Sequence, residues 1–90
     1  MKITRVDVDG KLLKVEVDGE THTILNLIST KLLEYENVEI AGYDIPHPLQ
    51  ERGKLIVRVK EGSPVEQLIK GIDELISEFK DLKNALEQLR

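Results

Sequence analysis

Residues 62–90, GSPVEQLIKGIDELISEFKDLKNALEQLR, contain the clearest structural signal in the chain. Ser63 precedes a proline and is followed three residues later by Glu66, which together form a capping box that marks the start of a helix. Beyond this box, apolar residues recur at alternating intervals of three and four, as in an a/d repeat. They are Val65, Leu68, Ile72, Leu75, Phe79, Leu82, Leu86 and Leu89. The pattern predicts one helix of about 26 residues, roughly 39 Å long.

This helix should be longer than the sheet beneath it, because a six-residue strand covers only about 20 Å. Ile69 and Ile76 widen the apolar stripe over the first two-thirds of the helix, which we expect to pack on the sheet. The narrower remainder, called the seam here, consists of Phe79, Leu82, Leu86 and Leu89. Contiguous exposed apolar patches usually mark interfaces, so the seam is predicted to dock on a partner. The alternative is that it folds over the first helix of the same chain.

The N-terminal half of the chain predicts a hairpin and a shorter helix. Residues 2–18 alternate apolar and polar side chains around Asp9-Gly10, a pair that favours a type I′ turn between two half-buried strands. Helical spacing follows from Thr23 to Tyr35, with Thr21 or Thr23 as the capping residue. The expected buried face of this helix consists of Ile24, Leu27, Ile28, Leu32 and Tyr35.

Two further strands separate the helices. Residues 38–46 alternate with a change of face at Ala41-Gly42, which indicates a bulge, and the segment Pro46-His47-Pro48 ends this strand. Residues 54–60 form the last strand, with Leu55, Val57 and Val59 facing inward. The resulting order, β-β-α-β-β-α, predicts a single α+β domain over residues 1–90. Its four-stranded sheet is mainly antiparallel, and the C-terminal helix is the longer of its two helices.

Composition argues against several classes of function. The formal net charge is −4 and only three residues are aromatic, so the chain lacks the positive charge and stacking platforms of a typical nucleic-acid binder. With no cysteine there is no disulfide, thiolate nucleophile or cysteine-ligated metal, which fits a cytoplasmic protein. Residues 1–9 have no apolar core like that of a signal peptide, and no run approaches the length of a membrane span.

The two histidines are the remaining candidates for chemistry. His22 and His47 lie 25 positions apart and neither belongs to a recognisable metal-ligand motif. His22 stands between two threonines, but no acidic residue is positioned by spacing to orient it as a general base. A small histidine-dependent hydrolase or isomerase centred on either histidine is therefore the enzymatic alternative, and local structural roles are the simpler interpretation.

Two local motifs, together with the order of elements, resemble subunit L of archaeal RNA polymerase. The family motif E-D-H-T-L-G-N is matched at four of seven positions by residues 20–26, ETHTILN, with Leu25 in place of the glycine. The second motif, G-Y-x-x-x-H-P, is matched in full by Gly42, Tyr43, His47 and Pro48. The family is the counterpart of the eleventh subunit of eukaryotic polymerase II and is similar to the dimerisation domain of the bacterial alpha subunit.

This resemblance implies a non-catalytic assembly subunit. It would form a heterodimer with the larger alpha-like subunit of the RNA polymerase, and the pair would form a platform for the large catalytic subunits. Carried over by position, the expected interface residues are His22, Thr23, Leu27, Phe79, Leu82, Leu86 and Leu89. The segment from Gly42 to Pro48 would shape the adjoining surface. No catalytic residue, metal, cofactor, nucleic-acid contact or membrane contact is expected, and a homodimeric adaptor that pairs the same seam with itself is the structural alternative.

Overall fold

The protein forms one antiparallel sheet with two helices on the same face, in a computed structural model that describes residues 1–19, 22–45 and 52–90. The elements are β1 (Lys2–Asp9), β2 (Leu12–Asp18), α1 (His22–Leu32), β3 (Val38–Asp44), β4 (Arg52–Val59) and α2 (Pro64–Glu87). The strand order is β1-β2-β4-β3, and all neighbouring strands are antiparallel. The predicted α+β architecture is therefore confirmed. The candidate cap Thr21 and the segment Pro46-His47-Pro48 lie outside the described residues.

The β1–β2 hairpin is present, but its turn is one residue later than predicted. Asp9 pairs with Leu12, so Gly10 and Lys11 are the two turn residues. Gly10 has φ +57°, a left-handed conformation that is least costly for a residue without Cβ. Asp9 itself remains in the ladder, because the strand pairing extends to the last residue before the glycine.

The apolar core lies between the sheet and the helices. As predicted, β4 contributes Leu55, Val57 and Val59, all at most 3% exposed, and β2 contributes three alternating residues to the same face. Those residues are Leu13, Val15 and Val17. By contrast, every residue of β1 is exposed, so the prediction of a half-buried first strand is wrong. The helices pack on β2, β3 and β4 and leave the edge strand uncovered.

Helix α1 buries a different face from the one predicted. Its core residues are Leu25, Ser29 and Leu32, which are spaced at i, i+4 and i+7 along one side of a helix. Ile24 and Leu27 are only partly buried. The helix begins at His22 and ends at Leu32, so Thr23 lies within its first turn and is not the cap.

Strand β3 contains a bulge, placed earlier than predicted. The register shifts between Val38 and Ile40, whereas Ala41 and Gly42 pair regularly with β4. The bulge at Glu39 is what turns Ile40 outward, where it is 47% exposed, before Ala41 again packs against the core.

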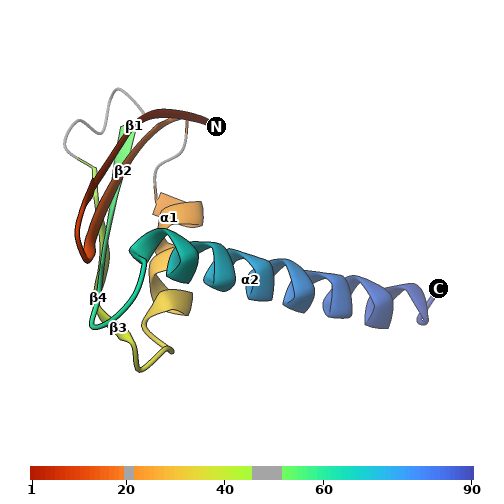
Figure 1. Cartoon of the computed structure of the whole chain (residues 1–90). Coiled ribbons are helices and arrows are strands. Elements are labelled where there is room, and N and C mark those ends of the chain that lie inside the picture. Colours follow the sequence, from red (N-terminus) through yellow and green to blue (C-terminus); the bar gives the residue numbers. More distant parts are fainter. Residues whose placement is uncertain (20–21, 46–51) are drawn as a thin grey trace.

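Helix α2 starts as predicted and extends well beyond the sheet (Figure 1). Ser63 is its N-cap, and its hydroxyl oxygen accepts a hydrogen bond of 3.2 Å from the backbone N–H of Glu66. From Ile76 to the C-terminus every residue is exposed, and this part of the chain is called the arm below. Ile69 and Ile76 are each 47% exposed, so the expectation that both pack on the sheet is wrong. Among the described residues, no helix is both long enough and apolar enough to span a membrane.

Candidate subunit interface

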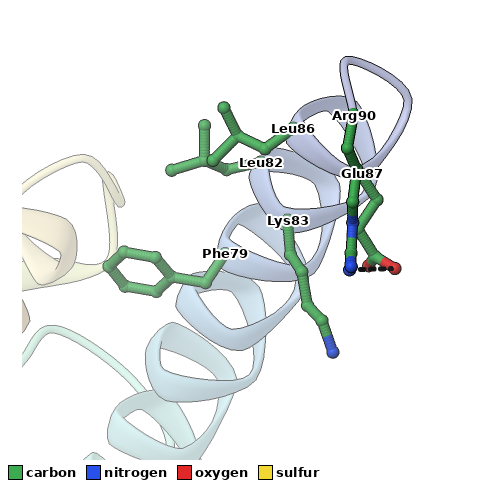
Figure 2. Close-up of a pocket in the computed structure, with 6 residues that line it drawn as sticks. All are labelled: Phe79, Leu82, Lys83, Leu86, Glu87 and Arg90. Carbon is green, nitrogen blue, oxygen red and sulfur yellow. Dashed lines mark ion pairs between the residues drawn. The ribbon is translucent and has the colours of Figure 1, made fainter.

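The seam forms an exposed apolar row along the arm. Phe79 and Leu82 are each 54% exposed, Leu86 is 56% exposed, and Leu89 is 82% exposed. Figure 2 shows the first three of these side chains leaving the same side of the helix. They border a shallow hollow together with Lys83, Glu87 and Arg90, and an ion pair of 3.8 Å joins Glu87 to Arg90. Because these side chains remain more than half exposed, the alternative in which the seam is buried against α1 is not the conformation observed.

The seam carries free energy that only another surface can release. Complete burial of a leucine or phenylalanine side chain is favourable by roughly 1.5 to 3 kcal/mol. Covering the exposed half of Phe79, Leu82 and Leu86 is therefore worth about 3 kcal/mol in total, before the entropic cost of association is subtracted. The arm has the chemistry of a docking element.

The predicted interface residues of α1 form a second, separate surface. His22, Thr23 and Leu27 line one shallow depression on the outer side of the helix. Asn26 and Thr30 complete it. The structure thus brings together the three predicted residues of α1, and it brings together Phe79, Leu82 and Leu86 in the hollow on the arm. The two hollows share no residue.

His22 connects the two sequence motifs. Its Nδ1 lies 3.2 Å from the hydroxyl oxygen of Tyr43, and the two rings meet edge to face with centroids 5.7 Å apart. This contact holds the start of α1 against β3. Gly42 precedes Tyr43 on the strand, and a Cβ at this glycine would meet no atom within 4 Å, so packing within this chain does not require a glycine there. His47 and Pro48, the other two residues of the second motif, lie outside the described residues.

A charged cluster, which the sequence analysis did not identify, joins the two helices. The side chain of Lys31 is only 6% exposed, and its ammonium group contacts the carboxylates of Glu34 at 3.5 Å, Glu74 at 3.6 Å and Glu78. The hydrogen bond to Glu78, followed by the negative charges of Glu34 and Glu78, outweighs the effect of burial and raises the pKa of Lys31. The i,i+3 spacing of Lys31 and Glu34 is visible in the sequence, but the pairing between helices is not.

Close packing accompanies this cluster. A Cβ at Gly71 of α2 would lie 3.0 Å from a methyl carbon of the buried Leu32, so the helices approach each other closely at this point. Burial, followed by the adjacent Glu74 carboxylate, raises the pKa of Tyr35 to about 12. The Tyr35 hydroxyl, and then the Lys31 ammonium, lower the pKa of Glu74 in turn. The base of the arm is thus held to α1 by packing and charge together.

The described residues offer little for catalysis or metal binding. Within residues 1–19, 22–45 and 52–90, no group of three or more histidine, aspartate or glutamate side chains is arranged to hold a metal ion. In the same ranges, the hydrogen-bond partner of His22 is a tyrosine hydroxyl rather than a carboxylate. A general base oriented by an acid is therefore not formed at His22 in this structure.

Comparisons with known proteins agree with the fold. The family model of the RNA polymerase Rpb3/Rpb11 dimerisation domain matches residues 12–85. DNA-directed RNA polymerase subunit Rpo11 of Korarchaeum cryptofilum is 41% identical over 91 residues, which cover 99% of this chain and 93% of that protein. Rpo11 of Archaeoglobus fulgidus is 32% identical over 99% of this chain and its own full length.

The crystal structure of DNA-directed RNA polymerase subunit L from Thermoplasma acidophilum has the same fold. It matches with a TM-score of 0.84 over 98% of this chain and 89% of that chain, at 24% sequence identity. The expected resemblance is confirmed both by sequence and by fold. The chain belongs to the Rpb3/Rpb11 dimerisation-domain family of RNA polymerase subunits.

Proposed function

We propose that this chain is a non-catalytic assembly subunit of an archaeal DNA-directed RNA polymerase, and that it pairs with the larger alpha-like subunit of that enzyme. The heterodimer then serves as the platform on which the large catalytic subunits assemble in the cytoplasm. The single observation that carries this proposal is the exposed seam on an arm that continues beyond the sheet, in a chain whose family is a dimerisation domain.

The residues divide the work between two elements. Phe79, Leu82 and Leu86 supply the apolar row that the partner covers. The depression around Leu27 on α1 supplies a mixed polar and apolar surface at the other helix. The contacts of Lys31 with Glu74 and Glu78 hold the base of the arm against α1, so the seam is presented with little conformational freedom to lose on binding.

A homodimeric adaptor is the second candidate, because the same exposed seam could pair with itself. The family description supports the heterodimer instead, since it names a domain shared by two different proteins. An enzyme centred on His22 or His47 has no supporting contact among the described residues. It would require a bell-shaped pH–rate profile that either histidine-to-alanine change abolishes.

The test replaces two leucines of the seam with aspartate. The Leu82→Asp/Leu86→Asp variant adds two negative charges to the row, and we expect its affinity for the alpha-like subunit in isothermal titration calorimetry to fall by at least a hundredfold. Both side chains are more than half exposed in the isolated chain, so the circular-dichroism spectrum should be unchanged.

A matched control separates the apolar row from charge and helix propensity. Lys80→Gln/Asn84→Asp also changes the net charge by −2 and has the same spacing of four, but these residues lie on the side of the arm opposite the seam. The control should bind the alpha-like subunit with the affinity of the unmodified chain. Undiminished binding of the seam variant would refute the proposed function.

A further inference from the structure

The edge strand β1 presents an apolar surface that no element of the described chain covers. Ile3, Val6 and Val8 are 60%, 52% and 53% exposed and are called the β1 face here. In the ladder they pair with three core residues of β2, namely Val17, Val15 and Leu13. Since directly paired residues of neighbouring strands lie on the same side of a sheet, the β1 face points to the side that carries both helices.

The helices leave this part of the sheet uncovered because of their positions. Helix α1 packs on β3 and β4, and α2 packs on β4 and β2. The strand order β1-β2-β4-β3 therefore places β1 beyond α2, on the side away from α1.

Helix α2 is also apolar on the side that faces away from α1. Gly71 marks the side of α2 in contact with α1. At 100° per residue, Ile69 and Ile76 are rotated from Gly71 by about 160° and 140°, and both are 47% exposed. These two residues, called the α2 flank, thus turn toward the β1 side of the molecule. The β1 face and the α2 flank are two uncovered apolar surfaces that border the same corner between helix and sheet.

The seam alone provides too little apolar surface for a stable pair. A standard interface buries about 800 Å² on each partner. On the scale of 25 cal/mol per Å², the four seam side chains offer on the order of 150–300 Å² of exposed apolar area. The β1 face and the α2 flank add five more large apolar side chains on a neighbouring part of the molecule. An occupant that covers them together with the seam approaches the size of a stable interface.

We propose that the projecting helix of the partner subunit lies in this corner, against the β1 face and the α2 flank. In a pseudo-twofold pair of related domains, each contact occurs twice with the roles of the two chains exchanged. If the arm of this chain docks on the uncovered sheet face of its partner, the arm of the partner docks on the uncovered sheet face here. This inference rests on the proposed function and identifies a second half of the same interface, with an apolar stripe of a helix as its ligand.

The first experiment places charge on the β1 face. The variant Val6→Glu/Val8→Glu should weaken binding to the alpha-like subunit at least tenfold in isothermal titration calorimetry. The matched control, Lys2→Gln/Arg5→Gln, makes the same change in net charge on the same strand. Its residues lie on the opposite side of the sheet, where Lys2 pairs with Asp18 and Arg5 with Glu16, and it should leave the affinity unchanged.

The second experiment does not depend on the folding of a charged variant. The chain has no cysteine, so Val8→Cys provides one attachment point for a benzophenone photocrosslinker. Irradiation of the complex with the alpha-like subunit, followed by mass spectrometry, should place the crosslinks in the projecting helix of that subunit. Crosslinks confined to other parts of the alpha-like subunit would overturn the inference.

The outcomes separate this inference from the proposed function. If the seam variant loses binding while Val6→Glu/Val8→Glu binds like its control, the inference is overturned and the proposed function stands. If neither variant loses binding, both are overturned. Crosslinks between two copies of this chain that persist when the alpha-like subunit is present would also overturn the inference and assign the β1 face to a homodimer.

Discussion

Replacement of Leu25 by glycine should severely destabilise the isolated chain, even though glycine is the residue of the family motif at this position. Leu25 is 2% exposed and packs in the core beneath α1. Loss of a buried leucine side chain costs about 2 to 5 kcal/mol, and glycine in place of alanine within a helix costs about 1 kcal/mol more. The expected loss of about 3 to 6 kcal/mol compares with a total unfolding free energy of roughly 5 to 14 kcal/mol for a domain of this length.

The assay is thermal and urea unfolding followed by circular dichroism. A change of 1 kcal/mol shifts the Tm of a domain of this size by about 4 to 8 °C, so Leu25→Gly should lower the Tm by at least about 12 °C. Leu27→Gly is the matched control, because it has the same backbone cost but removes a side chain that is only partly buried on the outer face of α1. Equal losses in the two variants would refute the assignment of Leu25 to the core.

The base and the start of α2 provide three further predictions. The Tyr35 pKa of about 12 lies above its ordinary value of 10.0, so absorbance titration should show one tyrosine ionising near pH 12. Stability should fall as pH rises from 10 toward 12, and Tyr35→Phe should remove both effects. The pKa of Glu74 is lowered, so its contribution is present above its ordinary value of 4.5 and is lost as pH falls through the folded-state pKa. In urea unfolding, Glu74→Gln should therefore destabilise the chain at neutral pH and have no effect at strongly acid pH. Ser63→Ala removes the N-cap acceptor of α2 and should cost about 1 kcal/mol in the same assay, whereas Ser77→Ala in the exposed middle of the helix should not destabilise.

The features that the sequence predicted well are those specified by local chemistry. The start of α2 depends on Ser63, Pro64 and Glu66, which act within one turn of helix. The seam was predicted because the a/d repeat continues past the length that a short sheet can cover. The inward residues of β2 and β4 follow from strict alternation, which both strands retain because their inner faces are buried.

The features that were predicted wrongly or missed depend on tertiary packing. The sequence of α1 has apolar residues at both 24 and 25, so two stripes are available, and contact with the sheet selects Leu25. The exposure of β1 follows from where the helices lie, which no local pattern specifies. The same holds for Lys31, whose carboxylate partners Glu74 and Glu78 are more than forty residues away in the chain.

The proposed heterodimer is tested most directly by size-exclusion chromatography with light scattering. The samples are the chain alone, the chain mixed with the alpha-like subunit, and the Leu82→Asp/Leu86→Asp variant mixed with the same subunit. We expect a stable one-to-one complex for the unmodified chain and none for the variant. A tight homodimer of the chain that persists when the alpha-like subunit is added would contradict the proposed function.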